Sequence, residues 1–133
     1  DKFLRIRVRK LLFELEKEGL NKKKFINTIN NLKFSEKVIK FYVDENLRKN
    51  SFFLLKKNQL IINFNEFFTQ PYEVVFRSLS DAIKIIGKNY YLVRGKKVDK
   101  IIEEIKKKTS LKVTLGGCII KRVNQTVIIS KEH

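Results

Sequence analysis

Residues 111–130 read LKVTLGGCIIKRVNQTVIIS, in which three β-branched runs are separated by Gly116-Gly117 and by Asn124-Gln125. Glycine pairs and Asn-containing turns end strands, so the stretch predicts strands of a small antiparallel sheet with one buried face. No helix pattern follows Gly116-Gly117. We therefore interpret the pair as a turn or bulge in a sheet and not as a phosphate-binding loop.

Two shorter extended runs precede this region. FFLL and LIINF lie on either side of residues 56–59 and predict a β-hairpin, although Lys57-Asn58 is a weaker turn signal than Asn-Gly. The segment after the hairpin is expected to form a short turn that places Phe67 and Phe68 in the core.

Two helices are predicted between the hairpin and the closing strands. The first follows Gln70-Pro71, where proline suits a first turn, and ends at Gly87. The second runs roughly from Lys97 to Lys108 with its β-branched residues on one face. Residues 51–133 are thus expected to form a compact α+β domain with the order ββααβββ.

The opening stretch RIRVRKLLFEL, residues 5–15, fits both a strand and a helix. A helix is favoured because the apolar residues follow helical spacing and the run ends at Glu18-Gly19. Helices prefer acidic residues in the first turn, and here basic residues stand there instead, so the helix dipole does not explain them. The apolar positions are Leu4, Val8, Leu11, Leu12 and Leu15.

A second helical run is expected from the N-cap residue Asn21 to about Asn50, with a break left open near Phe34-Ser35. The predicted organisation is α+β, with N-terminal helices followed by a small domain with an antiparallel sheet. It comprises a basic helix in residues 1–19, a long helical segment in residues 20–50 and the compact domain in residues 51–133.

The charge balance indicates a polyanionic partner. Lys and Arg number 30 against 14 Asp and Glu, which gives a net charge of +16, and 43% of the residues are apolar, as in ordinary globular proteins. Of the basic residues 23 are lysines, and a coding bias toward Lys would account for part of this excess. The seven arginines are therefore the more specific indicators.

Cysteine and hydropathy patterns suggest a cytoplasmic protein. The single Cys118 cannot form an internal disulfide and is expected to be a small buried hydrophobic residue. No apolar run approaches the ~20 residues that span a bilayer, so no membrane partner is expected. The absence of Met and the terminal His133, interpreted as the start of an affinity tag, suggest a fragment.

The order of several motifs resembles the C-terminal half of the tRNA(Ile)-lysidine synthetases over nearly the whole chain. These motifs are the R-x-R-x-R-K-L-L helix, a long second helix, a helix that begins near proline and contains Arg77, YYLVR at residues 90–94, and LGGCIIKR at residues 115–122. The resemblance implies an ATP-dependent ligase that joins lysine to the wobble cytidine of an isoleucine tRNA.

The resemblance also implies what this chain lacks. In that family the chemistry belongs to an N-terminal ATP-pyrophosphatase-type domain with an S-G-G-x-D-S loop, which would bind ATP and Mg²⁺, and no such motif occurs here. The chain alone is expected to have no catalytic residue, no metal site and no cofactor. Its implied partners are isoleucine tRNA with a CAU anticodon and its own catalytic domain, with a homodimer left open.

The candidate RNA-binding residues occur in three places. They are Arg5, Arg7, Arg9 and Lys10 in the first helix, Arg94, Lys96 and Lys97 in and after the loop NYYLVRGKK, and Arg122 in the closing motif. The first group is expected to contact either tRNA or the catalytic domain. Tyr90 and Tyr91 would either stack on RNA or pack on the core.

Two alternative functions stay open. The chain could be a stand-alone basic RNA-binding module, which the absence of an upstream S-G-G-x-D-S loop would favour. It could instead be a protein-interaction or dimerisation domain whose positive charge reflects a coding bias toward lysine. Exposed phenylalanines such as Phe52 or Phe67 would favour that last interpretation, because exposed apolar patches indicate partners.

Overall fold

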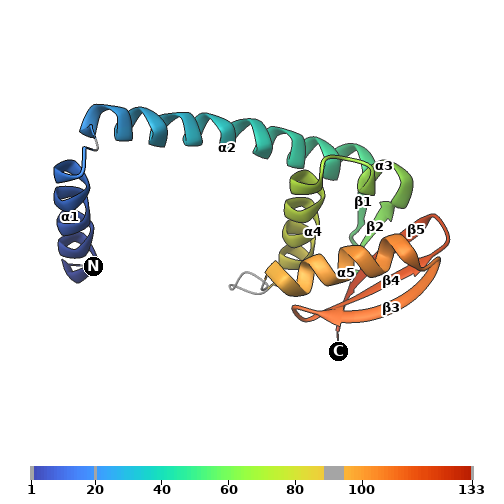
Figure 1. The fold of residues 1–133 in the computed structure, drawn as a ribbon. Coiled ribbons are helices and arrows are strands. Elements are labelled where there is room, and N and C mark those ends of the chain that lie inside the picture. The colour runs from blue at the N-terminus through green and yellow to red at the C-terminus, as the bar shows by residue number, and fades with distance from the viewer. Residues whose placement is uncertain (1, 20, 89–94, 133) are drawn as a thin grey trace. The chain divides into compact units, whose positions relative to one another are not determined.

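The computed structural model describes residues 2–19, 21–88 and 95–132 (Figure 1). The chain divides into two compact units, Asp1–Val38 and Ile39–His133. Helices come first and an antiparallel sheet closes the chain, so the predicted α+β class is confirmed.

The first unit contains helix α1, Lys2–Lys17, and the beginning of helix α2, Lys22–Asn50. The opening stretch is therefore a helix, as predicted. Between the two helices Gly19 has a φ of +103°, which suits glycine. Asn21 Oδ1 accepts a hydrogen bond from the Lys23 amide at 2.9 Å, which confirms Asn21 as the cap of α2.

Helix α2 is continuous, and the break considered near Phe34-Ser35 does not occur. Ser35 Oγ instead donates to the Asn31 carbonyl oxygen at 3.1 Å, one turn earlier. A serine inside a helix can donate its hydroxyl hydrogen bond in this way. The preference of serine for N-cap positions therefore does not break α2 at Ser35.

The second unit contains a five-stranded antiparallel sheet with the order β1-β2-β5-β4-β3. The strands are β1, Ser51–Leu54; β2, Gln59–Asn63; β3, Ser110–Leu115; β4, Cys118–Val123; and β5, Thr126–Lys131. Both predicted hairpin regions are therefore present, and β2 joins them by pairing with β5.

The tight turns of the closing strands agree with the sequence. Leu115 pairs with Cys118, and the two intervening residues, Gly116 and Gly117, have φ values of +59° and +76°. Asn124, in the next turn, has a φ of +54°. Glycine and asparagine adopt this left-handed region most readily, so these residues fix the register of β3, β4 and β5.

Three helices connect β2 to β3 in the described residues, one more than expected. They are the short α3, Phe64–Phe68, then α4, Tyr72–Gly87, and α5, Gly95–Lys107. The predicted short turn is thus a helical turn, and it buries Phe67 and Phe68 as predicted. The element order of the unit after α2 is ββαααβββ.

Gly87 is the last residue of α4, as predicted, but it is not the residue with the left-handed conformation that ends the helix. The left-handed residue at the helix end is Lys88, with a φ of +54°, and its amide donates to the Lys84 carbonyl oxygen at 2.9 Å. A Cβ on Gly87 would lie 2.4 Å from the Gly116 carbonyl oxygen. Gly87 therefore allows the end of α4 to approach the β3–β4 turn.

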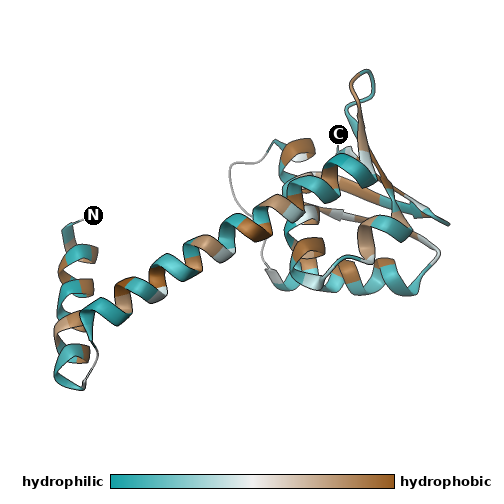
Figure 2. Cartoon of the chain, turned by 90° about the horizontal axis from the view of Figure 1, so that it is seen from above, coloured by the Kyte–Doolittle hydropathy of each residue, from teal (hydrophilic) through white to brown (hydrophobic). Residues whose placement is uncertain are grey.

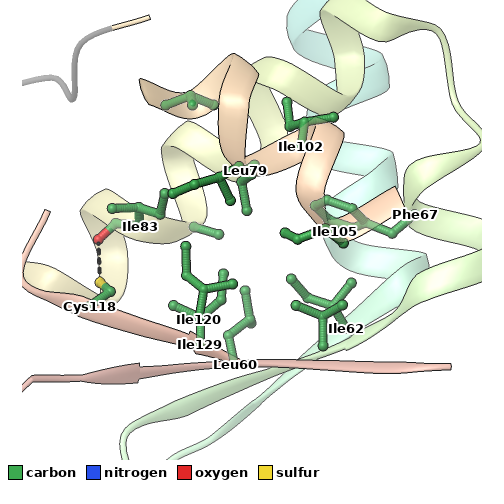
Figure 3. Close-up of a cluster of buried hydrophobic side chains, with 14 of the residues drawn as sticks. Leu60, Ile62, Phe67, Leu79, Ile83, Ile102, Ile105, Cys118, Ile120 and Ile129 are labelled. Carbon is green, nitrogen blue, oxygen red and sulfur yellow. Dashed lines mark hydrogen bonds between the residues drawn. The ribbon is translucent and has the colours of Figure 1, made fainter. Parts of the chain in front are cut away.

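Helices α4 and α5 cover one face of the sheet, and the core lies between these layers (Figure 3). We call this the inner face. Its central strands contribute buried side chains from every second residue. Examples are Leu60, Ile62, Ile120, Val127 and Ile129.

The opposite, outer face carries the intervening residues of the same strands. All of them are exposed or half-buried, in contrast to the buried centre of the inner face. One row across the sheet follows from the strand pairing, and it runs Phe52, Ile61, Ile128, Lys121, Lys112. This row has an aromatic residue at one end and two lysines at the other.

A buried asparagine attaches the end of α2 to this unit. Asn46 is 3% exposed, and its Nδ2 donates to the Phe67 carbonyl oxygen at 3.3 Å and to Ser78 Oγ at 3.1 Å. Its Oδ1 accepts a hydrogen bond from Asn50 Nδ2 at 2.8 Å. Because buried polar groups are costly when unpaired, these bonds hold the last turns of α2 against α3 and α4.

Candidate nucleic-acid interface

The basic residues predicted in α1 are exposed. Arg5, Arg7, Arg9 and Lys10 have no ion-pair partner among the described residues. Like charges one turn apart, such as Arg5 and Arg9, destabilise a helix, and the first turn of α1 has no acidic residue. These side chains can therefore contact an anionic partner.

The apolar stripe of α1 is also uncovered within the first unit, where α1 has no buried residue. Figure 2 shows hydrophobic segments along this helix and along α2. Leu4 and Leu11 are each 58% exposed, whereas Leu12 and Phe25 are half-buried. A stripe of this kind indicates a surface that packs against something else.

In the second unit, an open groove of about 590 Å³ lies between α5 and the edge strand β3. Its charged lining residues are Lys97, Lys100 and Lys112, with Glu104 as the one acidic residue among the described residues that line it. We call it the α5–β3 groove. It combines Lys97, which the sequence predicted, with two lysines that the sequence analysis did not select.

The α5 sequence accounts for one wall of this groove. Val98, Ile101, Ile102 and Ile105 are buried against the sheet, which leaves Lys97 and Lys100 exposed to solvent. The Tyr72 hydroxyl donates to Asp99 and connects the first turns of α4 and α5. Lys96 is exposed on the same turn but does not line the groove.

A pair of like charges extends the basic surface onto the outer face. Lys112 lies directly opposite Lys121 in the β3–β4 ladder, and both are exposed. Like charges at directly opposite positions destabilise a sheet. A bound anion would offset this repulsion.

This pair could have been found in the sequence. Once Gly116-Gly117 is taken as a two-residue turn, Leu115 must face Cys118, and counting back three positions sets Lys112 opposite Lys121. Lys100 is one helical turn from Lys97 and could have been selected by spacing. That these lysines share a groove depends on the packing of α5 beside β3, which the sequence pattern does not specify.

Arg122 is not available to RNA, so its prediction as an RNA contact is wrong. It is 4% exposed, and its guanidinium donates to the Ile105 carbonyl oxygen and, at 2.7 Å, to the Asn124 carbonyl oxygen. The guanidinium carbon lies 3.5 Å from the centre of the Phe64 ring. Arg122 is two residues after Ile120 on β4, so both side chains point to the inner face of the sheet. There Arg122 caps the end of α5.

Arg94, Tyr90 and Tyr91 lie outside the described residues. The choice between RNA stacking and core packing for the two tyrosines therefore stays a prediction.

No metal-binding group of three or more His, Cys, Asp or Glu occurs in the described ranges 2–19, 21–88 and 95–132.

Cys118 is buried, as expected. Burial raises the pKa of its thiol to about 11. Its Sγ lies 3.2 Å from the Ile83 carbonyl oxygen (Figure 3). A thiol of this kind is a poor nucleophile.

Two acidic side chains on the second unit have shifted pKa values. Hydrogen bonds from Arg48 and Lys49 lower the pKa of Glu45 below its usual range. Desolvation by burial, with a contribution from Asp44, raises the pKa of Asp81. Each shift has an ordinary local cause, and neither group belongs to the α5–β3 groove.

None of the helices in the described residues is both long and apolar enough to cross a bilayer.

Comparison with protein-family models, with curated proteins and with solved structures finds no match for this chain.

Proposed function

We propose that this chain is the tRNA-binding and tRNA-orienting C-terminal region of an ATP-dependent ligase that attaches lysine to the wobble cytidine of isoleucine tRNA. The observation that carries the RNA-binding part is the gathering of Lys97, Lys100 and Lys112 in one groove beside Lys121. The particular reaction and the particular tRNA are inferred from the sequence resemblance.

The groove is suited to the sugar-phosphate backbone. Lysine ammonium groups neutralise phosphates without reading base identity, so this surface would position RNA and not select its sequence. A net charge of +16 adds long-range attraction toward a polyanion. Selection of the correct tRNA would then depend on the shape of the tRNA, on other contacts or on the catalytic domain.

Catalysis belongs, in this proposal, to an N-terminal domain that binds ATP and Mg²⁺ and acts in the cytoplasm. The uncovered stripe and the arginines of α1 would lie at the junction with that domain or against tRNA. The same stripe also supports a second candidate, a protein-interaction or dimerisation surface, since Leu4 and Leu11 are more than half exposed. Of the phenylalanines considered for that role, Phe52 is 59% exposed and Phe67 is fully buried.

The proposal is tested by measuring affinity for isoleucine tRNA with a CAU anticodon and for an elongator methionine tRNA across a range of salt concentrations. We expect tighter binding to the isoleucine tRNA that persists as salt rises. Equal and salt-sensitive binding would support a generic RNA-binding module instead. Absence of binding to either tRNA, together with a concentration-dependent mass, would favour the interaction domain.

A further inference from the structure

A shallow hollow lies away from the α5–β3 groove, between the last turn of α2 and the outer face of the sheet. Its volume is about 490 Å³. We call it the Phe52 hollow. The residues that line it include Lys49, Asn50, Phe52, Ile61, Asn63 and Gln125.

An aromatic ring and an aliphatic side chain supply the apolar part of this hollow. Phe52 is 59% exposed and lies directly opposite Ile61 on the outer face. An exposed ring beside an aliphatic side chain offers a flat apolar surface on which a ligand can stack. Bases of unpaired RNA stack on rings presented in this way.

Two amides with no side-chain partner among the described residues supply the polar part. Asn63 stands at the N-cap position of α3, yet its side chain makes no capping hydrogen bond. Gln125 is exposed in the β4–β5 turn, and the Phe64 amide donates to its carbonyl oxygen at 2.9 Å, which fixes the turn. Because an amide both donates and accepts, it can pair with the edge of a base.

A second hollow of about 300 Å³ shares Lys49 and Asn50 with the first. We call it the Tyr42 hollow. Two of its lining residues are exposed aromatics, since Phe41 is 60% exposed and Tyr42 is 53% exposed. The lining also includes Gln70, Asn46 and the carboxylate of Glu45. Exposed aromatic side chains therefore line both hollows that share Lys49.

Lys49 is placed to contact a phosphate between the two hollows. Its Nζ lies 3.1 Å from a carboxylate oxygen of Glu45, and its side chain is 62% exposed. An exposed ion pair contributes little to stability, and Arg48 holds the same carboxylate at 3.0 Å. Lys49 can therefore turn to an incoming anion without leaving Glu45 unpaired.

We propose that the Phe52 and Tyr42 hollows bind unpaired nucleotides of a single RNA strand, with one base stacked on Phe52 and paired with the amides of Asn63 or Gln125. This inference rests on the proposed RNA-binding function and adds a second contact of different chemistry. The groove would hold backbone phosphates of any RNA, whereas the hollows require bases that are free to leave a helix.

The test compares a short single-stranded RNA with a blunt-ended RNA duplex, using the full chain of 133 residues. Phe52→Leu should weaken binding of the single strand about tenfold and leave duplex binding unchanged, because stacking on the ring is lost. Asn63→Ala should weaken single-strand binding severalfold. No capping bond is lost in that variant.

Phe53→Leu is the matched control. Phe53 is 40% exposed on the same edge strand but faces the other side, opposite Leu60, and does not line either hollow. The inference is overturned if Phe52→Leu binds single strands as the unchanged chain does, or if both phenylalanine variants weaken both RNAs equally. Wild-type binding to the duplex would then still support the proposed function, whereas binding to neither RNA would overturn both.

Discussion

The two faces of the sheet use the same strands for different purposes. On β4, Lys121 points outward and is exposed, while the next residue, Arg122, points inward and is buried with its donors satisfied. Basic character alone therefore does not identify a binding residue. The alternation of side chains along a strand decides whether a cation is buried in the fold or exposed to solvent.

Deletion of inner-face side chains should produce the largest change in stability. Ile120→Ala removes a fully buried side chain at the centre of the core and should lower the free energy of unfolding by about 2–5 kcal/mol. Ile119→Ala, on the half-buried outer face, should cost clearly less. Urea denaturation of both variants measures the difference, and equal losses would contradict the assignment of the two faces.

The close approach of α4 to the β3–β4 turn gives the next largest effect. Gly87→Ala should destabilise the protein by about 1–3 kcal/mol because the new Cβ would meet the Gly116 carbonyl oxygen. Gly95→Ala is the control, since its nearest neighbour would be a Phe76 ring carbon at 3.5 Å, an ordinary contact. A neutral Gly87→Ala in thermal denaturation would show that the approach is looser than described.

Replacement of the buried arginine should change stability and not RNA affinity. Arg122→Ala leaves the Ile105 and Asn124 carbonyl oxygens without their donor and should cost about 1–3 kcal/mol. The folded variant should bind RNA as the unchanged chain does. Loss of RNA affinity in a variant that is still folded by circular dichroism would restore Arg122 as a binding residue.

The neighbouring lysine should show the opposite behaviour with the smallest change in stability. Lys121→Thr removes the repulsion with Lys112 and should stabilise the sheet by about 0.2–1 kcal/mol, while RNA affinity falls. Chemical denaturation and RNA titration on the same sample measure both quantities. A variant that gains no stability and keeps its affinity would mean that the lysine pair is only solvated surface charge.

Local signals predicted much of the fold. Gly116-Gly117 marked a hairpin, Asn21 marked a helix start, and β-branched runs marked the closing strands because each depends on only a few neighbouring residues. Helix α3 was missed because five residues are too few to show a helical period. The role of Gly87 was missed because it depends on Gly116, far away in the sequence.

The candidate site was predicted less completely. Lys97 was selected because it follows an aromatic and basic loop, but its partners Lys100 and Lys112 required the packing of α5 beside β3. Arg122 was misassigned because motif position was given more weight than the alternation of side chains along the strand. Phe52 was considered only as an apolar contact, since the amides of Asn63 and Gln125 come near it only in the folded sheet.

We propose that RNA binds at the α5–β3 groove, and the salt dependence of tRNA binding by Lys97→Gln/Lys112→Gln tests this proposal. Lys56→Gln/Lys57→Gln, in the exposed β1–β2 turn, removes the same charge and is the control. We predict that the groove variant binds more weakly and that its salt slope falls by up to about two units, while the control keeps both values. Equal losses in the two variants would contradict the account, because they would show diffuse attraction by net charge and no defined site.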